Sequence, residues 1–365
     1  MITVDDLSLQ YSGAPLFSKV NLQFTPGNCY GIIGANGAGK STFLKILSGQ
    51  LEPSTGNVYI DPKARMSVLK QDQTMYDAYT VMDTVILGNQ RLYDCGKEKD
   101  AIYAKDEMTD EDGIRASELE EEFADLGGWE AESDASRILQ GLGVAPEHHE
   151  TMMSDMDPRL KVKVLLAQAL FGHPDIILLD EPTNNLDLAS VVWLEDFLMN
   201  NAKAVMVISH DKAFVDHITT RTIEIARGRI YDYKVNYSHY LELRRERREQ
   251  QQAAYDNQQK MIAETREFIE RFKGTYSKTN QVQSRVRMLE KLELIEVDEE
   301  DRSALNLRFP PAPRSGSYPV ITSELGKAYG DHRVFSDVSI TIGRGDKVAF
   351  VGRNGEGKST MVKAI

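Results

Sequence analysis

Cysteine is nearly absent from this sequence of 365 residues, where only Cys29 and Cys95 occur, in unrelated contexts. Two such cysteines provide neither the disulfide framework of a small secreted domain nor a multi-cysteine metal site. The length and a hydrophobic content of 41% indicate instead two or three domains, each with its own hydrophobic core.

Long apolar runs are also missing. No segment approaches the roughly 18 to 20 apolar residues of a membrane-spanning helix. The first residues lack the regions of a signal peptide. We therefore expect a cytoplasmic protein with no membrane partner.

The sequence also has fewer positive than negative residues: 43 Lys and Arg against 56 Asp and Glu, which gives a net charge of −13. Nucleic acids are bound through clustered Lys and Arg, so the overall composition argues against a general affinity for them. The distribution of charge therefore matters more than its sum.

One sequence unit starts twice, at a constant offset of 318 residues. The paired positions include Tyr11 and Tyr329, Phe17 and Phe335, Gly34 and Gly352, and Lys40 and Lys358. We expect a complete first unit over 1–237 and the N-terminal fragment of a second over 319–365. The second copy stops before the downstream motifs of the first, so we expect a cut or fragmentary chain.

Two other segments have helical patterns. Residues 238–309 contain no proline and a single glycine, Gly274, and two apolar stripes at helical spacing predict an antiparallel hairpin of long helices that reverses near Gly274. Residues 91–131 are acidic with partly helical spacing, which predicts a helical insertion in the first unit. A solvated helical face is the default interpretation of that insertion.

A phosphate-binding loop follows a short apolar strand pattern at 30–33 and precedes a helical pattern at 43–47. It satisfies G-x-x-x-x-G-K-[ST] with Gly34, Ala35, Asn36, Gly37, Ala38, Gly39, Lys40, Ser41 and Thr42. The glycines let backbone amides surround phosphate oxygens, Lys40 reaches the outer phosphates, and the Ser41 hydroxyl can ligate Mg²⁺.

Two later apolar runs bring polar residues to the same sheet edge. The run at 175–179 ends in Asp180 and Glu181, where Asp180 would hold Mg²⁺ and Glu181 would polarise the attacking water as general base. The run at 204–208 leads to His210, which is placed to contact the γ-phosphate. A lone histidine in such a position is more often structural.

Together these motifs resemble the ATP-binding-cassette superfamily, which implies an α/β P-loop cassette that uses ATP and Mg²⁺. By this resemblance Tyr11 stacks on adenine, Gln71 senses Mg²⁺ and the γ-phosphate, residues 185–187 cross to the other cassette, and His210 is the switch histidine. The matching nucleotide-binding positions of the second copy are Tyr329, Gly352, Asn354, Gly355, Gly357, Lys358, Ser359 and Thr360.

Within the superfamily, the chain resembles the ABC-F family of soluble twin-cassette proteins that act on ribosomes, and most closely its YbiT-like subgroup. The features that carry this are the run LDEPTNNLD at 179–187, the missing membrane domain and the helical linker. Membership implies that the two cassettes pair, that the linker reaches toward the peptidyl-tRNA region of the ribosome, and that 91–131 is the family's arm.

The predicted linker tip is basic, in contrast to the rest of the chain. From 271 to 287 the charged residues are Arg271, Lys273, Lys278, Arg285 and Arg287, all positive, with Phe272 and Tyr276 between them. Such a tip suits contact with rRNA and tRNA phosphates. An ordinary solvated turn is the alternative.

The sequence departs from the family at its signature, usually Leu-Ser-Gly-Gly, where this chain has Met156-Asp157-Pro158-Arg159. Pro158 has no amide hydrogen and Asp157 would repel phosphate, so we expect a weak or non-hydrolytic site at Lys358. We also expect the 365-residue chain to bind ATP but hydrolyse it poorly, because the signature that would complete the Lys40 site is not among its residues.

Two other functions use the same motifs. The ATPase subunit of a transporter carries the same motifs, but the long linker disfavours it. A chromosome-maintenance ATPase places a coiled coil between the phosphate loop and the Asp-Glu strand, whereas here both precede the linker.

Overall fold

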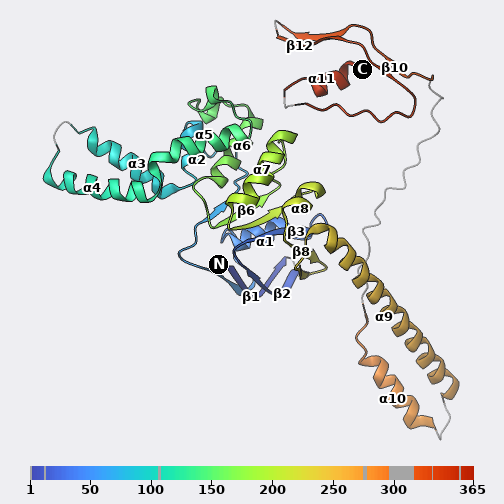
Figure 1. The fold of residues 1–365 in the computed structure, drawn as a ribbon. Helices are drawn as coiled ribbons and strands as arrows, with labels where there is room; N and C mark the ends of the chain where they lie inside the picture. Colours follow the sequence, from blue (N-terminus) through green and yellow to red (C-terminus); the bar gives the residue numbers. More distant parts are fainter. Residues whose placement is uncertain are drawn as a thin grey trace.

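A six-stranded sheet lies at the centre of the first unit (Figure 1). The computed structural model describes residues 2–11, 14–105, 108–273, 278–295, 316–330, 332–352 and 355–365. In spatial order, the strands are β5 (Met66–Val68), β6 (Ile176–Asp180), β7 (Ala204–Ile208), β3 (Asn28–Gly34), β8 (Arg221–Ala226) and β9 (Arg229–Tyr233). All neighbours are parallel except β9, which runs antiparallel to β8. The carboxyl ends of β3, β6 and β7 therefore meet at one edge.

A smaller antiparallel sheet covers one face of the central sheet. Its order is β2 (Ala14–Phe24), β1 (Ile2–Tyr11) and β4 (Thr55–Ile60). The core between the sheets includes Phe17, Phe24 and Phe43, with Phe43 on α1 (Lys40–Leu47). From the central sheet, Ile176 and Leu178 of β6 belong to this core.

Helices cover the opposite face, where Ile177 and Leu179 of β6 join a second core. This alternation along one strand is what a parallel strand buried on both faces requires. The covering helices are α2 (Val81–Ile86), α5 (Ala131–Gly141), α6 (Pro158–Leu170), α7 (Leu188–Asn201) and α8 (Lys212–Ile218). Short 3-10 turns lie at Gly128–Glu130, Pro146–His148 and Met153–Asp155.

The acidic insertion forms a pair of helices, α3 (Gln90–Tyr103) and α4 (Asp110–Asp125), which projects from the helical layer (Figure 1). Cys95, Ile102, Ala116 and Leu119 form a small core between the two helices. The prediction of a helical insertion in a phosphate-loop α/β fold is thus confirmed.

The linker begins with α9 (Tyr237–Phe272), which leaves the sheet beside β8 (Figure 1). It pairs with α10 (Thr279–Glu290), since Gln258 bonds to Glu293 and Ile295 while Arg285 lies over the Phe268 ring. This register is antiparallel. α10 is shorter than the long helix predicted, and the predicted reversal at Gly274 lies outside the described residues.

The C-terminal unit repeats the start of the first. It contains β10 (Val320–Ile321), β11 (Leu325–Tyr329), β12 (His332–Val338), β13 (Thr341–Ile342) and α11 (Lys358–Ala364). Residues with positive φ recur at the offset of 318: Asp6 and Glu324, Lys19 and Asp337, Gly27 and Gly345, Gly37 and Gly355, Gly39 and Gly357. The two copies therefore share backbone geometry as well as sequence.

None of the helices in the described ranges is long and apolar enough to cross a lipid bilayer.

Candidate nucleotide-binding site

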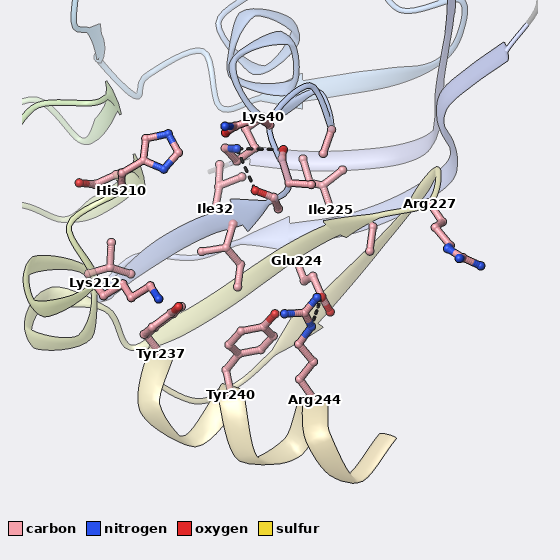
Figure 2. A pocket seen from close by; sticks show the side chains of 18 residues that line it. Ile32, Lys40, His210, Lys212, Glu224, Ile225, Arg227, Tyr237, Tyr240 and Arg244 are labelled. Atoms are coloured by element: carbon pink, nitrogen blue, oxygen red, sulfur yellow. Dashed lines mark hydrogen bonds and ion pairs between the residues drawn. The ribbon is translucent and has the colours of Figure 1, made fainter. Parts of the chain in front are cut away.

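The phosphate loop joins β3 to α1 through a tight turn that needs glycine. Gly39 has a φ of 97°, a conformation that L side chains rarely adopt. A Cβ atom at this position would also lie 2.6 Å from Leu16 Cδ2. The Lys40 ammonium donates to the carbonyls of Gly34 at 2.9 Å and Ala35 at 3.1 Å (Figure 2). The loop is thus folded around the lysine that would meet the outer phosphates.

No side chain caps the N-terminus of α1, because its N-cap is Gly39. The first amides of a helix have no partner within the helix and carry partial positive charge. Together with Lys40, they form the arrangement that binds phosphate groups in strand-loop-helix sites.

Asp180, at the carboxyl end of β6, lies beside Gln71, whose Nε2 donates to Asp180 Oδ2 at 3.3 Å. The structure thus brings together two of the three predicted Mg²⁺ residues, and the third, Ser41, follows Lys40 in α1. Within the described ranges, no three His, Cys, Asp or Glu side chains gather as a metal site. A magnesium ion bound through one carboxylate, a hydroxyl, nucleotide phosphates and water needs no such cluster, so the residues present fit Mg²⁺.

Glu181 and His210 are in contact at the same sheet edge. The Glu181 backbone has a φ of 53°, and its amide donates to the Ile208 carbonyl at 2.8 Å. Its carboxylate accepts the His210 amide at 3.2 Å and lies 3.4 Å from His210 Nε2. A non-glycine residue with positive φ is uncommon and is typical of functional sites. The structure thus brings together the carboxylate and the imidazole that the sequence predicts at this sheet edge.

The loop before α7 is held by a buried ion pair that the sequence did not predict. Asp187 caps α7 by accepting the Ser190 amide at 2.9 Å, and Lys163 Nζ of α6 lies 3.5 Å from its other carboxylate oxygen. The Lys163 side chain is only 3% exposed. Burial acts to raise the pKa of Asp187, but the Ser190 amide and the Lys163 ammonium outweigh it and lower this pKa.

In the divergent signature segment, the Asp157 side chain caps the helix that follows. Asp157 is the N-cap of α6 and accepts the Arg159 amide at 2.8 Å, with Pro158 as the first residue of the helix. The start of α6 therefore carries a negative side chain, and its first residue, Pro158, has no amide hydrogen to offer.

A cavity of about 670 Å³ extends from the phosphate loop to the start of α9. Lys40 and His210 line one end, while Tyr237, Tyr240 and Arg244 of α9 line the other (Figure 2). Sequence patterns did not single out the α9 residues, which come together with the loop only in the folded sheet. The spacing of Arg244 and Arg247 on one helical face was the only available signal.

The remaining predicted residues divide into two groups. In the first unit, Gly34, Ala35, Asn36 and Ala38 line the cavity, and Gly37 and Thr42 lie in the loop and in α1. In the second unit, Lys358 Nζ donates to the Gly352 carbonyl at 2.8 Å, as Lys40 does to Gly34. The neighbours of Lys358 in the chain include the predicted residues Gly355, Gly357, Ser359 and Thr360. The Tyr329 side chain is exposed. The Tyr11 side chain and Asn354 lie outside the described part of the structure.

Two family models, both described as ABC transporter, match residues 17–184 and 223–309. The first segment contains the phosphate loop and Asp180, and the second contains the whole of α9 and α10.

Curated relatives match along the whole chain. One is named uncharacterized ABC transporter ATP-binding protein YkpA, from Bacillus subtilis (strain 168), and is 46% identical over 365 residues, which are 100% of this chain and 68% of that protein. The probable ATP-binding protein YbiT of Escherichia coli O157:H7 is 39% identical over 100% of this chain and 69% of its own length. ABC transporter F family member 2 of Arabidopsis thaliana is 31% identical, with 100% of this chain and 55% of that protein covered.

Proposed function

This chain belongs to the ABC-F family of twin-cassette ATP-binding proteins, and from that premise we propose that it is an ATPase that acts on the ribosome in the cytoplasm. ATP and Mg²⁺ would bind at the phosphate loop of Lys40, with Asp180 as metal ligand, Glu181 as general base and His210 as the γ-phosphate sensor. Residues 238–309 would form the part that contacts rRNA and tRNA.

The observation that carries the ribosomal part of the proposal is the basic end of the α9 and α10 pair. Arg271, Lys273, Arg285 and Arg287 are exposed there, and Lys278 is the N-cap of α10. Arg271 pairs with Glu267, and Arg285 stacks on Phe268 at 4.1 Å from the ring centroid. No acidic residue occurs from 271 to 289. On a chain of net charge −13, this end is where attraction to phosphates would concentrate.

The test replaces Arg271, Lys273, Lys278, Arg285 and Arg287 with Gln in the full-length protein carrying Glu181→Gln. Ribosome co-sedimentation with ATP is then measured across a salt series. Binding should weaken, and the slope of log affinity against log salt should fall by roughly 0.7 to 0.9 for each phosphate that the tip no longer neutralises. ATP affinity should stay unchanged, because none of these residues lines the cavity at the phosphate loop.

A matched control removes five positive charges from exposed positions away from the tip: Lys63, Arg229, Lys234, Arg245 and Lys260. Both variants lower the net charge equally, so only a specific tip contact separates them. Equal affinities and slopes in the two variants would refute the tip as the RNA contact. Co-sedimentation with membranes or with DNA in place of ribosomes would instead support one of the two rival ATPase functions.

The two nucleotide sites would also differ in activity. The site at Lys358 would face the signature segment of the first cassette when the cassettes pair, where the Asp157 carboxylate occupies the Arg159 amide and Pro158 has no amide hydrogen. We therefore assign hydrolysis mainly to the site at Lys40. The division into a cassette at 1–237, a linker at 238–309 and a second cassette from 319 is part of the same proposal.

A further inference from the structure

The linker helix α9 is attached to the cassette by a polar clamp near its first turn. Ser238 donates from its amide to Asp216 Oδ1 and from its hydroxyl to Asp216 Oδ2, each at 2.7 Å. Both oxygens of one carboxylate are thus used by one residue of α9. Hydrogen bonds to an ionised carboxylate are the stronger kind.

Asp216 belongs to α8, the helix that follows the histidine loop. Asp211 caps this helix by accepting the amides of Ala213 at 3.0 Å and Phe214 at 3.2 Å. Asp211 directly follows His210 in the chain, so the N-cap of α8 connects this helix to the His210 loop. Phe214, Val215 and Ile218 are buried, so α8 moves as a packed unit.

A second attachment fixes α9 to the sheet. The Glu224 carboxylate of β8 is 3% exposed and lies 2.9 Å from Arg244 Nε and 3.0 Å from Arg247 Nη2. In the parallel β3 and β8 pair, Glu224 is the register partner of Ile33, the residue before the phosphate loop. Buried charge pairs of this kind are costly to separate. Glu224 therefore anchors α9 to the rigid part of the site.

Glu224 and Arg244, which form the second attachment, line the cavity together with the phosphate loop. Figure 2 shows Tyr240 and Arg244 on α9 facing the strands, with Lys40 and His210 across the space. The Asp216 clamp and the Glu224 anchor thus hold α9 at two points near its start, Ser238 and Arg244.

We propose that the Asp216 and Ser238 clamp transmits the occupancy of the γ-phosphate position, through His210 and α8, to the linker helix α9. This inference rests on the proposed function of His210. His210 Nε2 lies 3.4 Å from the Glu181 carboxylate. Contact with a γ-phosphate draws His210 to the phosphate loop, α8 follows, and the clamp tilts α9 about Glu224. Asp216 is a positioning residue, since it contacts no reacting group.

The test measures hydrogen exchange of the α9 segment at 237–247 in the full-length Glu181→Gln protein, with and without ATP and Mg²⁺. ATP should change the exchange rates of these amides about 5-fold or more, the lower end of usual couplings between sites. Asp216→Ala should abolish that change, and ATP affinity should change by no more than the coupling factor itself, because coupling between two sites is reciprocal. Ser238→Ala, a smaller change at an exposed residue, removes the hydroxyl bond but keeps the amide bond, so it should reduce the change without abolishing it, and the double variant should match Asp216→Ala alone.

Asp256→Ala is the matched control, because this carboxylate also lies on α9 but bonds only within the helix, to Gln252 at 2.8 Å. It should keep the full response to ATP. An undiminished response in both Asp216→Ala and Ser238→Ala would overturn the clamp. ATP binding without any response at 237–247 would also overturn it, yet would leave the ATPase proposal intact. Failure of the parent protein to bind ATP would overturn both.

Discussion

Replacing Glu181 with Gln would remove the proposed general base and leave the rest of the nucleotide site in place. Gln has nearly the same shape, and its amide oxygen can still accept the His210 amide that lies 3.2 Å from the carboxylate. The Lys40 contacts with the phosphate loop and the Gln71 contact with Asp180 do not involve Glu181. ATP affinity should therefore hold within about threefold, because the phosphate-binding groups are unchanged.

The expected loss is in the rate of hydrolysis. A positioned general base contributes about 10²- to 10⁴-fold, which corresponds to about 3 to 5 kcal/mol of transition-state stabilisation. The assay is steady-state phosphate release by the full-length protein at saturating ATP, together with ATP binding measured by calorimetry.

Glu195 offers a matched control, because its carboxylate also contacts a histidine, His217, at 2.7 Å, with similar exposure but outside the candidate site. Glu195→Gln should keep the turnover of the parent protein. If Glu181→Gln retained turnover within about threefold of the parent, or if Glu195→Gln lost as much, the assignment of Glu181 as general base would be refuted.

Three further outcomes follow from the same geometry. Gly39→Ala should weaken ATP binding by at least about tenfold in calorimetry, because the new side chain would have a positive φ and would lie 2.6 Å from Leu16. Gly49→Ala is the control, because Gly49 has a φ of 73° but open space around it, and this variant should bind ATP as the parent protein does. Asp187→Asn should destabilise the fold by about 3 kcal/mol, because it leaves the Lys163 ammonium buried without its partner charge. The pKa of Asp187 is lowered in the folded protein, so this stabilisation is present above about pH 4 and is lost as the pH falls through the lowered pKa. The difference in Tm between the variant and the parent protein should therefore shrink in acid. A difference that stays constant with pH would contradict the ion pair. Burial raises the pKa of Cys29 to about 12, so iodoacetamide should label it at pH 8 roughly a thousandfold more slowly than in the unfolded chain, as followed by mass spectrometry.

The phosphate loop was predictable from sequence because its geometry depends on residues adjacent in the chain. Glycine is required where the backbone turns at Gly37 and Gly39, and Lys40 must follow directly to reach the same phosphates. The carboxylates of Asp180 and Glu181 were predictable for a related reason, since parallel strands end at one sheet edge. Each of these inferences used local pattern and one rule of topology.

Contacts between distant segments were not predictable in the same way. The Glu224 anchor joins β8 to α9, and β9 and a turn lie between them in the chain. The partner of Lys163 is Asp187, 24 residues further along the chain. A lysine in an apolar helix pattern gives no hint of which carboxylate it meets. The length of α10 was misjudged because the composition of 238–309 has no proline to mark a helix end, and helix ends are set by packing as much as by propensity.

The repeat of backbone geometry bears on how the two nucleotide sites differ. Positive φ occurs at Asp6 and Glu324, and again at Lys19 and Asp337, although the paired side chains differ in length or in sign of charge. Because such a conformation costs a non-glycine residue about 1 to 2 kcal/mol, its recurrence under different side chains means that the sheet connection demands it. The lysines of the two phosphate loops, Lys40 and Lys358, also make the same contact with their first glycine. The loops themselves thus give no reason for unequal activity. The unequal activity proposed above would therefore come from the segment that each loop faces in the paired cassettes, and Asp157 with Pro158 is the part of that surface that this chain supplies.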